Sequence, residues 1–280
     1  MWIWMALASA VLLGCYDVAK KLALRNNNTY SILLVATALS ALFLAPFLTA
    51  GCLHDHLCLM LKAVLVTSSW VSGMIALELL PITTVSTFKT SRPMFVVLFS
   101  IIIYGERLNW LQWAGVLAVF AALWLLTISS EHEGIRLKGN KGFAALLVSI
   151  FTGVASALYD KHIMAGMQPL FVQGWTNVYI TIILVFLTFI NNRRSGRQPF
   201  KWDWTLLIIA VLITGADMLY FFSLKADGSM LSVISLIRRS SVIVTFALGA
   251  VLFKEKRIAE KAGVLALMLA GVSTLMLASV

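Results

Sequence analysis

Residues 104–126, YGERLNWLQWAGVLAVFAALWLL, are matched by residues 253–276, FKEKRIAEKAGVLALMLAGVSTLM, in the second half of the chain. Both stretches begin with a charged turn, continue as a long apolar run and share the letters AGVLA after a one-residue gap. An apolar run of about 20 residues is what a membrane-spanning helix needs. The two stretches therefore predict a membrane protein in which one helical unit occurs twice.

The composition of the whole chain also indicates a membrane protein. Of its 280 residues, 60% are hydrophobic and 12% are charged, and the mean hydropathy is +0.92. Because ordinary soluble domains carry roughly 25% charged residues, this chain has more apolar surface than one soluble core can bury. We predict an all-α polytopic membrane protein with ten transmembrane helices, at about residues 2–24, 29–50, 59–80, 82–104, 108–129, 140–163, 169–190, 204–225, 229–253 and 258–278.

Other residues recur in the same order in the two halves. Lys89 aligns with Arg238, and the dipeptide Tyr-Asp occurs at 16–17 and again at 159–160. An ordered recurrence of polar residues is stronger evidence for duplication than shared apolar letters. We therefore predict a first five-helix repeat at 1–130, a connecting loop at 131–139 and a second five-helix repeat at 140–280.

The odd number of helices in each predicted repeat has a topological consequence. After five crossings the chain is on the opposite side of the membrane, so the second repeat enters inverted relative to the first. Inverted repeats are typical of secondary transporters, whose binding sites lie near the middle of the bilayer between the repeats. The sequence thus predicts two inverted five-helix repeats with a central site.

Basic residues are distributed unequally between the predicted loops. Most follow odd-numbered helices, whereas the loops after even-numbered helices hold only Lys62, Arg107, Lys161 and Lys225. Because cytoplasmic loops carry an excess of Lys and Arg, this distribution favours odd-numbered loops in the cytoplasm and both termini outside.

Four basic residues lie inside predicted membrane helices. Lys89 and Arg92 are in the fourth helix, and Arg238 and Arg239 are in the ninth. A central Lys or Arg costs roughly 2.5–3.5 kcal/mol, whereas each strongly apolar residue returns only about 0.3–0.6 kcal/mol. Such cations face the helix bundle or a water-filled cavity and mark functional sites. Their donors suit phosphate and carboxylate groups, which predicts an anionic substrate.

Hydroxyl groups and a proline accompany these cations. Thr87 belongs to a run of hydroxyl residues that leads to Lys89, and Ser235 leads to Arg239 at helical spacing. Pro93 has no N–H to donate to the carbonyl of Lys89, four residues earlier. That carbonyl is left for water or a ligand, so we predict a substrate pocket lined by the fourth and ninth helices.

Three aspartates are candidates for a coupling site or a charge partner. Asp217, near the middle of the eighth helix, either pairs with an arginine of the ninth helix or binds a coupling proton or cation. Asp17 is expected to pair with a lysine one turn later, and Asp160 occupies the matching position in the sixth helix.

Three further residues allow two interpretations each. Gln173 and Asn177 share one face of the seventh helix, where they either bind substrate or bridge helices. Trp70 lies among serines in the third helix, where it either stacks on a ligand or packs in the core. We include all three as candidate substrate-binding residues.

The remaining motifs argue against catalysis and metal binding. Cys52, His54, His56 and Cys58 lie close together, but their spacing matches no common zinc pattern. The chain has no phosphate-binding loop or nucleophile elbow. We therefore predict no metal, no cofactor and no enzymatic activity, and we assign the net charge of +10 to membrane loops rather than to a nucleic-acid partner.

Alanines recur at four-residue spacing in the fifth and tenth predicted helices. They occupy residues 114, 118 and 122, and residues 262, 266 and 270. Small residues at this spacing let helices approach closely in lipid. These helices therefore pack within the chain or form a homodimer interface.

The segments FKTSRPMFVVLFSIIIYGERLNWLQWAGVLA (88–118) and LIRRSSVIVTFALGAVLFKEKRIAEKAGVLA (236–266) resemble EamA-type permeases of the drug/metabolite transporter superfamily. The first also resembles triose-phosphate and nucleotide-sugar translocators, in which basic residues of these helices hold a phosphorylated substrate. The positions that match are Lys89, Pro93, Arg238 and Arg239. The resemblance implies a multi-pass protein of a bacterial inner membrane with both termini in the cytoplasm, opposite to the loop charges.

These observations support one leading hypothesis and two alternatives. The leading one is a secondary transporter in the lipid bilayer that moves a small anionic metabolite by alternating access. The first alternative is a proton-coupled exporter of drugs or amino acids that uses Asp217. The second is a membrane-embedded protein that does not transport.

Overall fold

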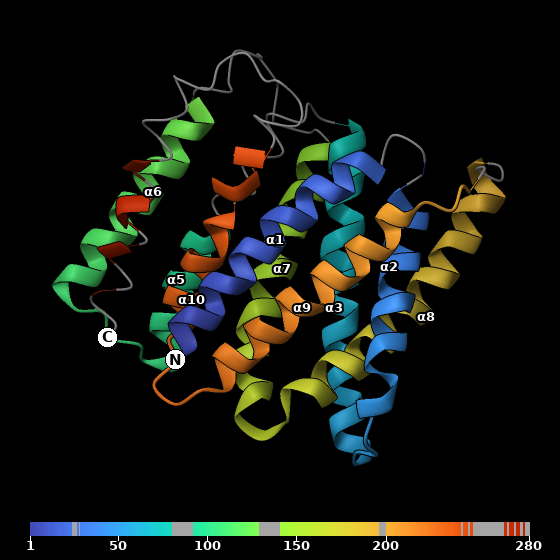
Figure 1. Cartoon of the computed structure of the whole chain (residues 1–280), viewed down its shortest axis with the longest axis horizontal. Helices are drawn as coiled ribbons and strands as arrows, with labels where there is room; N and C mark the ends of the chain where they lie inside the picture. The colour runs from blue at the N-terminus through green and yellow to red at the C-terminus, as the bar shows by residue number, and fades with distance from the viewer. Residues whose placement is uncertain are drawn as a thin grey trace. The chain divides into compact units, whose positions relative to one another are not determined.

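The structure is a computed structural model of the chain. It describes residues 1–23, 27, 29–79, 92–128, 141–195, 200–241, 243–245, 247–248, 266–267, 269–271, 273–274 and 277. In these residues every regular element is a helix (Figure 1). The helices are α1 (Trp2–Ala23), α2 (Thr29–Leu44), the 3₁₀ helix η1 (Ala45–Phe47), α3 (Leu53–Leu79), α5 (Arg92–Tyr104), α6 (Trp110–Ile128), α7 (Lys141–Gly166), α8 (Pro169–Ser195), α9 (Trp204–Lys225) and α10 (Leu231–Arg239).

Six of the described helices are long and apolar enough to cross a membrane. These are α1, α2, α3, α7, α8 and α9, and the shorter helices α5 and α6 are also apolar. The prediction of an all-helical fold is therefore confirmed for the described residues. The number of ten membrane helices and the inverted repeats stay predictions.

Helix α3 begins earlier than the sequence pattern indicated. It starts at Leu53 instead of residue 59, so Lys62 lies well inside the helix rather than near its first turn, and Lys161 lies inside α7. The assignment of Lys62 and Lys161 to loops was wrong. The polar letters GCLHDH at 51–56 resemble a break between helices, but an acid such as Asp55 is favourable in the first turn of a helix, where the helix dipole is positive.

The ninth predicted helix, 229–253, is interrupted within its described part. Helix α10 ends at Arg239, and the Ser240 N–H donates to the carbonyl of Ile237 at 3.0 Å. The Ser240 hydroxyl donates to the same carbonyl at 2.6 Å, and helical conformation resumes at Ser241. A serine that bonds back to its own helix in this way tightens and bends it, so the interruption directly follows the two arginines.

The chain divides into two compact units. Unit 1 comprises Met1–Thr67 and Asp160–Asp227, and unit 2 comprises Ser68–Tyr159 and Gly228–Val280. Each unit therefore combines helices from both halves of the sequence. The predicted repeats, 1–130 and 140–280, are defined by similarity in sequence and differ from these two structural units. The repeats stay a prediction.

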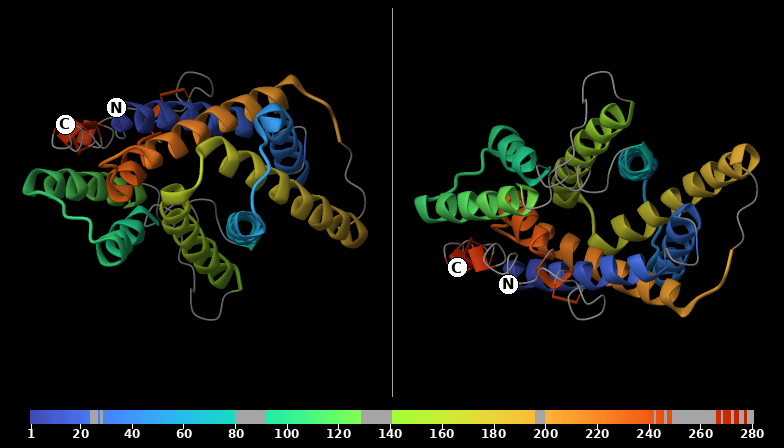
Figure 2. Two further views of the ribbon diagram at one scale, coloured as in Figure 1. Left: turned by 90° about the horizontal axis from the view of Figure 1, so that it is seen from below. Right: turned by 90° about the horizontal axis from the view of Figure 1, so that it is seen from above.

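Unit 1 is built around the contact between α1 and α9, which run side by side (Figures 1 and 2). Ala19 and Ala23 of α1 are buried in one cluster with Leu206 and Ile209 of α9. Small residues allow two helix backbones to approach closely in lipid. Helix α2 packs against both α8 and α9 in the same unit.

Unit 2 contains a close contact between α6 and the described helical residues near the C-terminus. A Cβ atom added to Gly271 would lie 2.9 Å from the backbone nitrogen of Val119 and 3.0 Å from Cβ of Ala118. The alanine stripe of α6 is thus used for packing inside the chain at Ala118. A homodimer through these helices stays a prediction.

Candidate functional site

Arg92 lies in a hydroxyl-lined position of unit 2. It is half-buried at the start of α5, and its Nη2 atom donates to Oγ of Ser69 on α3 at 3.4 Å. A Cβ atom on Gly153 of α7 would lie 1.4 Å from the same Nη2 atom. The guanidinium therefore occupies space that exists because residue 153 is a glycine.

Two serines fix the helices on either side of this guanidinium. The Ser69 hydroxyl donates to the Ser149 carbonyl at 2.8 Å, and the Ser149 hydroxyl donates to the Ser69 carbonyl at 2.7 Å. The rings of Phe95 and Phe151 pack at 5.4 Å beside them, on α5 and α7. Reciprocal bonds between α3 and α7 hold the Arg92 position in one geometry.

Pro93 is the next residue, in the first turn of α5. Proline is favoured there because the first N–H groups of a helix have no partner within it. Its predicted effect on the carbonyl of Lys89 concerns a residue outside the described part of the chain. Thr87 lies outside it too.

Arg238 and Arg239 occupy the last turn of α10 and are half-buried. Cations in this turn are stabilised by the negative end of the helix dipole. The Ser235 hydroxyl donates to the carbonyl of Ser232 at 2.9 Å, within the same helix. Unit 2 therefore contains Arg92, both arginines of α10 and Ser235, and it also contains the half-buried Trp70 of α3.

Glu106 builds the site although the sequence did not predict it as a site residue. Its carboxylate accepts hydrogen bonds from the N–H groups of Leu231 and Ser232, at 2.6 and 3.1 Å, and from the Ser232 hydroxyl at 2.5 Å. It therefore caps α10, the helix that carries the two arginines. The signal was the Gly-Glu-Arg turn, in which Gly105 has a φ of 62° that favours glycine.

Gln173 and Asn177 take part in a polar network of unit 1. Gln173 donates to the carbonyl of Thr214 at 2.8 Å, and Asn177 donates to Oγ of Ser40 at 2.6 Å. Oγ1 of Thr214 is 2.7 Å from the same Ser40 oxygen. These bonds join α2, α8 and α9, so Gln173 and Asn177 bridge helices, which is one of the two interpretations that their sequence positions allowed. A role of Gln173 and Asn177 in substrate binding stays a prediction.

Asp160 forms a buried ion pair with Lys62 in unit 1. Lys62 is 3% exposed and Asp160 is 5% exposed, and the two side chains come from α3 and α7. The Lys62 ammonium also lies 4.7 Å from the ring centroid of Phe221 on α9. The partner of Asp160 was not predicted, because Lys62 was assigned to a loop.

Asp17 and Asp217 lie near the Tyr16 phenol in unit 1. Both interact electrostatically with this side chain, as does Lys20, whose ammonium is 5.8 Å from the Tyr16 ring centroid. Asp17 is exposed, whereas Asp217 is half-buried in α9. The proposed roles of these acids in coupling stay predictions.

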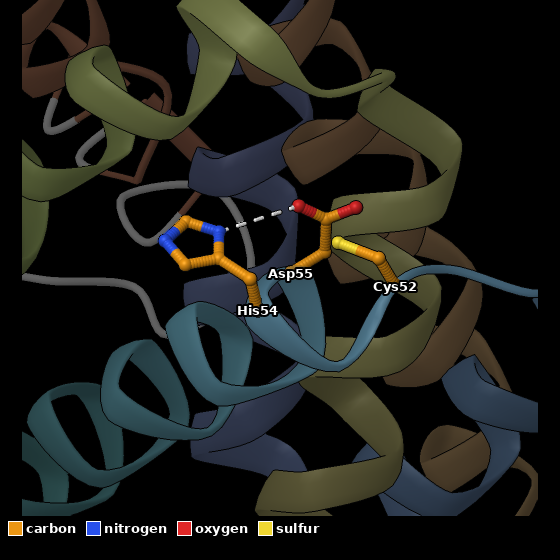
Figure 3. A group of neighbouring side chains, drawn as sticks. All are labelled: Cys52, His54 and Asp55. Carbon is orange, nitrogen blue, oxygen red and sulfur yellow. Dashed lines mark ion pairs between the residues drawn. The ribbon is translucent and has the colours of Figure 1, made fainter.

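Cys52, His54 and Asp55 form a cluster at the start of α3 (Figure 3). Their ligand atoms lie within 4.8 Å of one another, and Nδ1 of His54 is 3.7 Å from a carboxylate oxygen of Asp55. The His54 side chain is 82% exposed. Structural zinc sites are closed by four ligands, so we assign no metal to this open cluster.

The sequence was also compared with known proteins and structures. It matches the model of the EamA-like transporter family over residues 1–128 and again over residues 140–277. The chain belongs to the EamA-like transporter family. It is therefore a membrane transporter by family, which confirms the resemblance to EamA-type permeases and agrees with the prediction that it is no enzyme.

Two further comparisons concern single proteins. No curated protein sequence matches the chain. A solved structure described as a crystal structure of a protein has a TM-score of 0.79 at 14% sequence identity, covering 99% of this chain and 98% of that one. At this identity the likeness shows a shared fold.

Proposed function

We propose that this EamA-like protein is a secondary-active transporter that moves a small anionic metabolite, bearing a phosphate or a carboxylate, by alternating access. The observation that carries the proposal is the position of Arg92. Its guanidinium donates to the Ser69 hydroxyl and occupies the space beside Gly153, where a side chain would collide with it. Hydrogen bonds between Ser69 and Ser149 join the two helices at this position. Arg92 is a preorganised donor rather than a flexible surface charge.

The charged side chains that the structure describes in unit 2 favour an anion over a cation. Among the side chains that the structure describes in this unit, Glu106 is the one carboxylate, and it caps α10. Arg92, Arg238 and Arg239 belong to the same unit. An arginine presents five N–H donors in a fixed planar arrangement that matches carboxylate and phosphate oxygens, so these residues are suited to bind such groups.

The proposal includes a membrane arrangement. Ten helices would form two inverted repeats in the inner membrane of a bacterium, with the substrate site near the middle of the bilayer. Moving Lys62 and Lys161 into helices leaves fewer basic residues in the even-numbered loops, which supports odd-numbered loops in the cytoplasm. Labelling of single cysteines placed in these loops in intact cells would test the orientation.

The transport proposal is tested with purified protein in liposomes. Uptake of organic phosphates and carboxylates is screened first, and the transported compound is then measured with Arg92→Gln and Arg238→Gln. Each variant should reduce uptake at least about tenfold, since one charge-assisted hydrogen bond contributes roughly 1.5–3 kcal/mol. The matched control is Arg107→Gln, because Arg107 is an exposed arginine of the same unit. Full uptake by both site variants would refute the proposal.

A further inference from the structure

The Lys62–Asp160 ion pair lies in helices that are long and apolar enough to cross a membrane. Both side chains are at least nine-tenths buried. Ionisable residues at such positions are costly, and they are typically paired and functional. The transport proposal based on the arginines of unit 2 leaves this pair without a role.

Asp160 is the main partner of the buried Lys62 ammonium. The ammonium contacts the Asp160 carboxylate on one side and the Phe221 ring, at 4.7 Å, on another. A cation–π contact contributes only about 0.5–2 kcal/mol. Removing one partner of a buried pair costs roughly 3–5 kcal/mol, so the ring alone does not compensate the lysine.

This dependence links proton binding to anion binding. A proton on Asp160 removes the negative charge that Lys62 needs, and an anion from solution restores it. An anion that approaches Lys62 while Asp160 is ionised instead brings two carboxylates to one site, where like charges disfavour each other. By thermodynamic linkage, the proton and the anion therefore increase each other's affinity by the same factor.

We propose that Lys62 and Asp160 form a proton-linked binding site for the carboxylate group of a small anion. Asp160 takes one proton from water, Lys62 keeps its charge, and the incoming carboxylate takes the place of the Asp160 carboxylate. The site is neutral before and after, so one proton and one negative charge bind together. We expect the ligand group to be a carboxylate, because it must take over the contact that the Asp160 carboxylate makes with Lys62. The inference rests on the proposed function, since it assumes an anionic substrate.

Other titratable groups lie on the helices that carry the pair and on the helix that contacts Lys62. Among the side chains that the structure describes, they are His54, Asp55, His56 and Cys58 on α3, Lys141, Tyr159, Lys161 and His162 on α7, and Asp217, Tyr220 and Lys225 on α9. Histidine titrates in the physiological range, so His56→Gln and His162→Gln are needed as controls for any effect of pH.

The test measures carboxylate binding to the purified full-length protein as a function of pH. Thermal stability is recorded with increasing glutamate or succinate at about pH 6 and about pH 7.5, where these carboxylates are largely ionised. Sodium chloride at equal ionic strength corrects for screening. One linked proton predicts up to about a tenfold increase in affinity for each pH unit of acidification, and the two histidine controls should keep this dependence.

Three variants separate the roles of the pair. Asp160→Asn, which imitates the protonated acid, should bind carboxylate with an affinity that no longer depends on pH. Lys62→Gln should lose the pH-linked binding. The double variant Lys62→Gln with Asp160→Asn removes both charges of this pair together, so it should fold and should also lack this binding.

The outcomes distinguish the two proposals. Equal carboxylate affinity of the unmodified protein at both pH values would refute the proton-linked site and leave the transport proposal standing. Retention of pH-dependent binding in the double variant would refute it too. Failure of the unmodified protein to bind any tested carboxylate or phosphate would refute both proposals.

Discussion

Lys62 and Arg92 are both basic residues inside helices of a membrane transporter, but their partners differ. Lys62 in unit 1 is almost fully buried and paired with Asp160, whereas Arg92 in unit 2 is half-buried and donates to the neutral hydroxyl of Ser69. An ion pair has its charge compensated within the protein. The Arg92 guanidinium presents planar N–H donors that match carboxylate and phosphate oxygens, which suits it to an anionic ligand. Lys62, which already has a carboxylate partner, is suited to an exchange of one anionic partner for another.

Breaking the pair of unit 1 should give the largest effect. Lys62→Gln leaves Asp160 buried without its cation, which costs roughly 3–5 kcal/mol of stability. Thermal or denaturant unfolding in detergent would measure this loss. The comparison variant, Lys62→Met with Asp160→Leu, removes both charges and should be close to neutral. A loss below about 1 kcal/mol for the single variant would mean that the pair behaves like a surface ion pair.

Filling the space beside Arg92 should affect binding more than folding. In Gly153→Ala the new methyl group overlaps the guanidinium, so we expect the end of the Arg92 side chain to be displaced from this position while the helices stay in place. We expect anion affinity to fall about tenfold or more, equivalent to about 1.4 kcal/mol, as measured by anion-dependent thermal stabilisation.

The control for this variant lies on the same helix. A Cβ atom on Gly166 meets nothing within 4 Å, so Gly166→Ala should leave anion affinity unchanged. Equal losses in the two variants would show that any alanine in α7 disturbs the protein, and the assignment of Arg92 to the site would then lose its support.

The comparison also shows what the sequence could predict. Arg92 was identified because a cation within an apolar run is conspicuous, and the helix of α9 was predicted to the residue because clear polar breaks flank it. Lys62 was missed because polar letters before it imitate a loop, and its partner Asp160 is 98 residues away. The sequence did not identify Gly153 as a site residue. Its role depends on the Arg92 guanidinium that occupies the space beside it, and this neighbour is known only from the structure.

Glu106, the carboxylate that caps α10 in unit 2, provides the smallest test. Asp160 in unit 1 neutralises a cation, whereas Glu106 in unit 2 accepts from the N–H groups of Leu231 and Ser232 and from the Ser232 hydroxyl. Glu106→Gln keeps one carbonyl oxygen but loses the charge and part of the cap. The expected loss of stability is about 1 kcal/mol, measured by thermal unfolding against Arg107→Gln, an exposed neighbour that should have no effect.

Anion affinity in the same variant separates two roles of Glu106. If its charge mainly offset the arginines of unit 2, removing it would strengthen anion binding, because the site would become more positive. A cap makes the opposite prediction: α10 is held less firmly, so its arginines are less well positioned and anion binding stays equal or weakens. Tighter anion binding in Glu106→Gln would therefore show that Glu106, like Asp160, mainly neutralises cations. The difference between the two acids, one in an ion pair and one capping a helix, would then be refuted.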